Sequence, residues 1–80
     1  MEIIYKASAF KQLKKIPKTE LKKIRNKLEA IKNDPYAGKV LKGELQGFYS
    51  VKPWPYRIIY KIVSKQIVVV SVSHRQGSYK

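Results

Sequence analysis

The chain has 80 residues and carries 18 Lys and Arg against five Asp and Glu, so its formal net charge is +13 and its isoelectric point is about 10.1. It has no cysteine and one histidine. Disulfides and cysteine-ligated metal sites are thereby excluded, a lone histidine cannot hold a metal, and we expect no cofactor. So much positive charge favours a polyanionic partner, with nucleic acid ahead of an acidic protein or a membrane surface.

A chain of this length is expected to form one domain, residues 1–80, whose core lies near the lower size limit for folding alone. A stable partner protein would supply additional stability. No targeting signal is recognisable, and the longest apolar run, at residues 67–70, is far too short to span a bilayer. We therefore expect a cytoplasmic protein without membrane association.

The N-terminal half predicts a strand followed by two helices. Residues 2–6 favour a strand, and Ser8 is the expected N-cap of a short helix that ends at Pro17. Thr19 is the expected N-cap of a second helix, which the Asn-Asp-Pro sequence at residues 33–35 ends. One apolar stripe at helical spacing marks this second helix, formed by Leu21, Ile24, Leu28 and Ile31. Both helices carry lysines on their other faces, either as a solvated surface or as a field that attracts phosphates.

The C-terminal half predicts four strands. Two short candidates lie at residues 39–42 and 48–52, and two stronger ones lie at 56–63 and 67–73. Residues 64–65 are the expected apex of the last hairpin. The order of one strand, two helices and four strands predicts an α+β fold, in which an antiparallel-rich sheet carries an N-terminal helical hairpin on one face.

Basic residues are expected to converge at one end of this sheet. If the hairpin apex has two residues, Arg57 lies opposite Val72, and His74 lies on the same face, diagonal to Arg57. Lys52 joins them if residues 53–56 form a four-residue loop, whereas a three-residue loop would turn Lys52 to the other face.

Such a cluster suits cleavage of RNA. The reaction needs a group that activates the 2′-hydroxyl, a group that protonates the leaving 5′-oxygen, and cations that stabilise charge on the phosphate. His74 is a candidate acid or base, Arg57 and Arg75 are candidate phosphate ligands, and Lys52 adds a point charge. Tyr79 is a candidate proton donor or base-stacking residue. The lysines expected to contact RNA are Lys39, Lys42 and Lys61. The alternative is that His74 is an ordinary surface residue at a strand end.

Several short motifs together resemble the RelE/ParE superfamily of toxins from toxin–antitoxin systems. They are Leu41-Lys42-Gly43, the strand at 48–52, Tyr56-Arg57-Ile58-Ile59-Tyr60, the apolar run at 67–70, and His74-Arg75. The paired helices upstream agree with the architecture of the superfamily. The resemblance covers nearly the whole chain and implies the same α+β fold.

The resemblance implies one of two activities. RelE-like members are mRNA interferases that cut messages in the ribosomal A site, and ParE-like members poison DNA gyrase without cleaving RNA. We expect an mRNA endoribonuclease of the RelE-like branch, with mRNA and the ribosome as partners, and keep the gyrase inhibitor as the alternative. A cognate antitoxin, with an acidic or amphipathic segment, is expected to neutralise the toxin in a hetero-oligomer. A non-toxic RNA-binding module and an inactive toxin are further hypotheses.

The resemblance also implies a role for each site residue. Lys52 would face the scissile phosphate and Arg57 would bind a phosphate. His74 and Arg75 would supply the acid or base and the stabiliser of the transition state. Tyr79 would stack on or orient the nucleotide.

Two positions depart from the pattern of the superfamily. Ser50 stands where the strand often has a first basic residue, and Trp54-Pro55 stands where a Gly-Asp turn is usual. These departures bear on the roles of individual residues rather than on membership of the superfamily.

Overall fold

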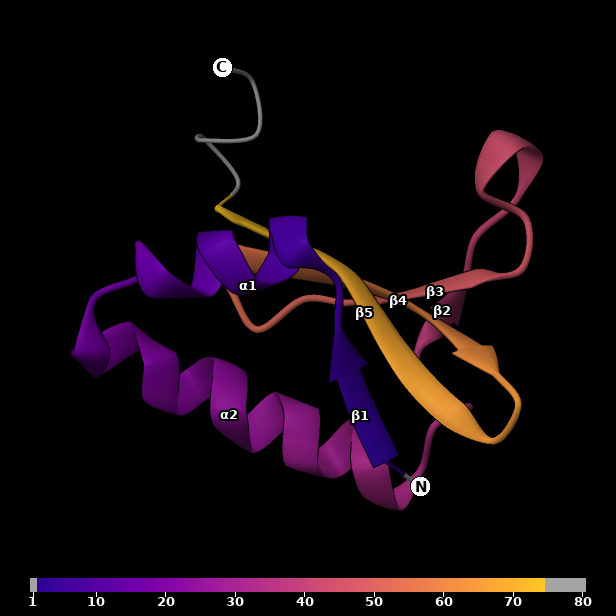
Figure 1. The fold of residues 1–80 in the computed structure, drawn as a ribbon, viewed down its shortest axis with the longest axis horizontal. Coiled ribbons are helices and arrows are strands. Elements are labelled where there is room, and N and C mark those ends of the chain that lie inside the picture. The colour runs from indigo at the N-terminus through magenta and orange to yellow at the C-terminus, as the bar shows by residue number, and fades with distance from the viewer. Residues whose placement is uncertain (1, 75–80) are drawn as a thin grey trace.

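The computed structural model describes residues 2–74 of the chain and has the expected α+β order (Figure 1). Its elements are β1 (Glu2–Tyr5), α1 (Ala7–Lys14), α2 (Lys18–Asn33), β2 (Lys39–Val40), the short 3-10 turn η1 (Gly43–Leu45), β3 (Phe48–Val51), β4 (Tyr56–Val63) and β5 (Gln66–His74). The five strands form one sheet in the order β1-β5-β4-β3-β2. β1 runs parallel to β5, and every other neighbouring pair is antiparallel.

The starts of both helices differ from the prediction. Ser8 and Thr19 lie inside α1 and α2, whose N-caps are Lys6 and Pro17 and have no side-chain capping bond. Pro17 suits the start of a helix because its ring fixes φ near the helical value and the first N–H groups need no intrahelical partner. α1 ends at Lys14, three residues before the predicted end at Pro17.

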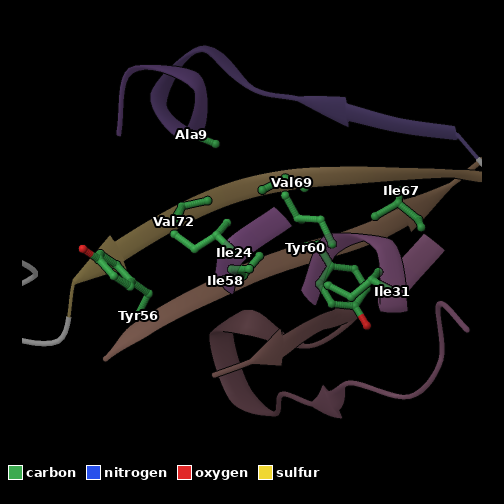
Figure 2. Packing of buried hydrophobic residues seen from close by; sticks show 10 residues of the cluster. Ala9, Ile24, Ile31, Tyr56, Ile58, Tyr60, Ile67, Val69 and Val72 are labelled. Carbon is green, nitrogen blue, oxygen red and sulfur yellow. The ribbon is translucent and has the colours of Figure 1, made fainter. Parts of the chain in front are cut away.

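The core lies between the helices and one face of the sheet (Figure 2). The apolar stripe of α2 is confirmed, because Ile24, Leu28 and Ile31 are buried, and α1 adds Ala9. β4 contributes every second residue, as a pleated strand requires, and β5 does so up to Val69. These buried sheet residues are Tyr56, Ile58, Tyr60, Ile67, Val69 and Val72.

Tyr60 anchors the connection between α2 and β2. Its side chain is fully buried, and its hydroxyl donates a hydrogen bond to the carbonyl oxygen of Pro35 at 2.7 Å. The backbone of Gly38 lies so close to the Tyr60 side chain that a Cβ at position 38 would clash with the Tyr60 hydroxyl. The glycine is therefore needed for the close approach of the chain.

A β-bulge shifts the register between β4 and β5. The two-residue apex is confirmed, because Val63 pairs with Gln66 around Ser64 and Lys65, which both have positive φ. The pairing then shifts by one residue between Ile59 and Tyr60, so that Val70 is the extra residue of β5. A bulge of one residue turns every later side chain of the strand to the opposite face.

This bulge makes the predicted pairing of Arg57 wrong. Arg57 lies opposite Ser73 instead of Val72, and His74 lies opposite Tyr56. Because directly paired residues share a face, His74 is on the face of Tyr56 and Arg57 is on the other.

α1 continues the hydrogen bonding of β5 where β1 stops. β1 pairs with β5 only as far as Val69, and the Lys6 N–H still donates to the carbonyl oxygen of Val69 at 3.0 Å. Beyond that point the Ser8 hydroxyl donates to the Val70 carbonyl oxygen at 3.0 Å, and the Gln12 side-chain oxygen accepts from the Val72 N–H at 2.8 Å. Side chains of α1 thus bond to the bulge residue Val70 and to Val72 beyond it.

Within residues 2–74, neither helix is long and apolar enough to cross a membrane.

Candidate nucleic-acid interface

The face of the sheet away from the core presents basic side chains. By alternation with the buried residues of β4, this face carries Arg57, Ile59 and Lys61. Arg57 is exposed and Lys61 is half-buried. We call this surface the outer face.

Lys52 and Arg57 lie opposite each other at one end of the outer face. The last pair between β3 and β4 joins Val51 to Ile58, so one further step along both strands brings Lys52 across from Arg57. This register confirms the four-residue loop at residues 53–56, which the Tyr56 N–H closes by donating to the Pro53 carbonyl oxygen at 2.9 Å. Both side chains are exposed, so their charges are available to an anion.

His74 lies at the same end of the sheet but on the core face. Its ring packs edge-on against Tyr56, with 5.1 Å between the ring centroids and an interplanar angle of 88°. Tyr56 is buried and His74 is half-buried. The structure therefore does not place His74 beside Arg57 on one face, and the bulge at Val70 is the reason.

The three lysines expected to contact RNA lie at different places. Lys39 pairs with Ser50, so β2 brings an exposed ammonium next to that serine. Lys61 pairs with Phe48, and its ammonium lies 5.7 Å from the centre of that ring. Lys42 lies between β2 and η1, in the loop that extends away from the sheet in Figure 1.

The remaining predicted site residues, Arg75 and Tyr79, lie outside the described residues. Within residues 2–74, no group of three or more His, Asp and Glu side chains could hold a metal ion.

A second feature, which the sequence pattern did not indicate, is an apolar groove of about 400 Å³ between α1, α2 and β1. Phe10 and Tyr5 line it, and both are partly exposed. Burial raises the pKa of the Tyr5 hydroxyl, the carboxylate of Glu29 raises it further, and the charge of Arg25 opposes the shift. The groove belongs to the helix side of the molecule, whereas Lys52 and Arg57 belong to the outer face.

The outer face can bind a phosphodiester backbone. An arginine can hold two phosphate oxygens in a fork, and a facing lysine adds a point charge. Exposed cations of this kind bind polyanions with an affinity that falls steeply with salt. The helical lysines extend the positive field over the rest of the surface, since all eight are exposed: Lys11, Lys14, Lys15, Lys18, Lys22, Lys23, Lys27 and Lys32.

Comparison with solved structures gives several toxins of the same fold. The toxin–antitoxin complex RelBE2 from Mycobacterium tuberculosis matches with 27% identity and a TM-score of 0.83, over 92% of this chain and 96% of that one. The YoeB dimer from Staphylococcus aureus matches with 26% identity and a TM-score of 0.76, over 92% and 95%. The intact RelBE complex of E. coli shares 19% identity and a TM-score of 0.79, over 91% and 94%, which supports the fold alone.

Among curated protein sequences, none matches this chain. A family model does match, over residues 3–79, and it describes the ParE toxin of the type II toxin–antitoxin system parDE. The match spans nearly the whole chain and agrees with the structural likeness to RelE and YoeB toxins. The chain therefore belongs to the ParE toxin family, within the RelE/ParE superfamily of type II toxins.

Proposed function

We propose that this toxin is an mRNA endoribonuclease, acting with the ribosome, whose outer face holds the RNA backbone. The observation that supports the proposal is the end of the β3–β4 ladder at Val51 and Ile58, because the next residues of the two segments are the exposed Lys52 and Arg57. Lys39 supports it, because it supplies a cation beside Ser50 from the neighbouring strand. The similarity to the RelBE2 and YoeB toxins, each above a quarter identity, favours the RelE-like branch.

In the proposed reaction, the 2′-hydroxyl attacks the adjacent phosphorus and the 5′-oxygen leaves. Lys52 and Arg57 bind the phosphate and stabilise the charge that builds on its oxygens. His74 is the proposed acid or base that transfers a proton, Arg75 a further stabiliser of the transition state, and Tyr79 the residue that stacks on or orients the nucleotide. His74 can take part only by reaching around the end of β5, since its strand position faces the core side.

The partner protein would be a cognate antitoxin, because solved relatives include toxin–antitoxin complexes. An acidic or amphipathic segment suits a chain with a net charge of +13. It would cover either the helices and a sheet edge or the basic outer face.

The test is to induce the protein in cells and to map the 5′ ends of messages. Cuts within codons, at positions set by the ribosomal A site, are expected for the intact toxin. Arg57→Ala should remove the cuts and relieve growth arrest, whereas Lys22→Ala, at an exposed lysine of α2, should retain both. Unaltered cutting by the Arg57→Ala and Lys52→Ala variants would refute the assignment.

The second candidate is a DNA gyrase inhibitor without nuclease activity. The family match to a ParE toxin favours it, as does the separation of His74 from Arg57. Induced DNA damage with intact messages would select this function instead.

A further inference from the structure

Trp54 is a large apolar side chain that lies outside the core. It is the only tryptophan of the chain, and 62% of its surface is exposed. Burial of a tryptophan removes more apolar surface from water than burial of most side chains, so an exposed tryptophan is a candidate contact for a partner. Its position is the loop between β3 and β4.

The backbone around Trp54 is constrained. Pro53 and Pro55 flank it, and each ring fixes its own φ. The hydrogen bond from the Tyr56 N–H to the Pro53 carbonyl oxygen, at 2.9 Å, closes the loop. Because the loop is already ordered, little backbone entropy remains to be lost when a ligand contacts the indole.

The neighbours of Trp54 are cationic. Lys52 comes just before Pro53, Arg57 comes just after Tyr56, and the register places the two cations across from each other. Sites for single-stranded nucleic acid combine cations that follow the backbone with aromatic rings on which bases stack. The loop brings both kinds of group together within six residues, 52–57.

A protein contact would more often be built from adjoining apolar side chains. Within residues 2–74, the other exposed large apolar side chains lie on different elements: Ile4 and Tyr5 on β1, Phe10 on α1, Tyr36 after α2, Val40 on β2, Leu45 in η1, and Val63 at the far end of β4. Along the chain, Trp54 is therefore close to two cations and to none of these exposed apolar side chains, which favours a nucleic acid.

We propose that Trp54 stacks on a base of single-stranded RNA next to the phosphate that Lys52 and Arg57 bind together. This proposal rests on the RNA-binding function proposed above and adds a base contact to it. Stacking on an aromatic side chain accepts every base, so Trp54 adds affinity and fixes the position of the strand rather than its sequence.

The test uses the single tryptophan as its own reporter. The full-length toxin is titrated with a 2′-O-methyl oligonucleotide, which cannot be cleaved by 2′-hydroxyl attack, and with an abasic oligonucleotide of equal length. The first probe should quench the fluorescence of Trp54. The abasic probe carries the same phosphates, and it should bind more weakly and leave the fluorescence unchanged.

Variants give the matching affinities, measured by anisotropy of a labelled 2′-O-methyl probe. Trp54→Ala should weaken binding by about 5- to 100-fold, the range expected for one stacked base, and Trp54→Phe should recover most of the loss. Tyr36→Ala is the control, because Tyr36 is 64% exposed and lies on a different connection.

The outcomes separate the two proposals. Salt-dependent binding that Trp54→Ala leaves unchanged, without quenching, would overturn the stacking contact and leave the RNA function standing. Failure of every probe to bind would overturn both. A fluorescence change produced by purified antitoxin or gyrase, and by neither oligonucleotide, would identify Trp54 as a protein contact and overturn the proposal as well.

Discussion

His74 packs edge-on against Tyr56, with 5.1 Å between their ring centroids, on the face of the sheet that carries the core. Arg57 follows Tyr56 in the chain and therefore projects from the outer face. The sheet therefore does not present the His74 imidazole and the Arg57 guanidinium to one phosphate from the same face. The facing pair on the outer face is Lys52 and Arg57.

This arrangement predicts which substitutions act independently. Arg57→Ala and His74→Ala should have additive effects on binding of the 2′-O-methyl probe, within about 0.5 kcal/mol, because the two side chains lie on opposite faces of the sheet. Lys52→Ala and Arg57→Ala should show a coupling above about 0.5 kcal/mol, because they would bind one phosphate together. Double-mutant cycles measured by probe anisotropy check both values. Strong coupling between Arg57 and His74 would mean that His74 reaches the outer face in the complex.

The sequence predicted the elements well because their signals are local. The alternation of residues 56–63 matches β4, the apolar stripe matches α2, and the two-residue apex at Ser64 and Lys65 is present. The helix starts were wrong, because Ser8 bonds to the Val70 carbonyl oxygen of a distant strand instead of capping its own helix. The spacing of residues in the sequence does not indicate a hydrogen bond to a distant strand.

The site was predicted only in part, and one residue explains the difference. The register near the turn at 53–56 was correct, so Lys52 faces Arg57. The bulge at Val70 was not foreseen, and it moved His74 to the other face. Residues 66–70 are almost continuously apolar, so alternation there gives no sign of an inserted residue. In the structure, the next buried residue of β5 after Val69 is Val72, three positions later rather than two. This spacing reflects the one-residue shift in register.

The bonds between α1 and β5 should contribute to stability. Gln12→Leu leaves the Val72 N–H without its side-chain acceptor and should lower the free energy of unfolding by about 1–3 kcal/mol. Ser8→Ala removes a more exposed bond and should cost about 0.5–1.5 kcal/mol. Urea unfolding gives both values, and Lys11→Ala, on the same helix, is the control, expected within about 0.5 kcal/mol of zero.

Hydrogen exchange locates the effect of Gln12. The Val72 amide should lose protection in Gln12→Leu and keep it in Lys11→Ala. Unchanged exchange of Val72 in Gln12→Leu would show that the 2.8 Å bond does not protect this amide in solution.

Gly38 should tolerate no side chain while Tyr60 keeps its hydroxyl. In Gly38→Ala the new Cβ would clash with that hydroxyl and lie 3.2 Å from the Ser50 carbonyl oxygen, so we expect a loss of about 1–3 kcal/mol. Tyr60→Phe alone removes the bond to Pro35 and should cost about 0.5–1.5 kcal/mol. The double variant should cost less than the sum by at least about 0.5 kcal/mol, because removing the hydroxyl removes the nearest clash. Strict additivity in urea unfolding would show that the clash is relieved in another way.

Tyr60 should also make stability depend on alkaline pH. Burial is the largest cause that raises the pKa of its hydroxyl above the ordinary value of 10.0, Tyr49 and Asp34 raise it further, and a backbone hydrogen bond from Gly38 opposes the shift. The folded state therefore holds this proton more tightly than the unfolded chain. The stability that depends on the proton is complete below pH 10.0 and is lost as the pH rises from there towards the pKa of the folded state.

A comparison with Tyr60→Phe isolates this effect. The difference in unfolding free energy between the two proteins should be constant below pH 10.0 and should shrink above it, because only the wild-type side chain can ionise. Tyr5, whose pKa is also raised, is present in both proteins and cancels. Urea unfolding at several pH values on both sides of 10.0 measures the difference, and parallel curves for wild type and Tyr60→Phe would contradict the linkage.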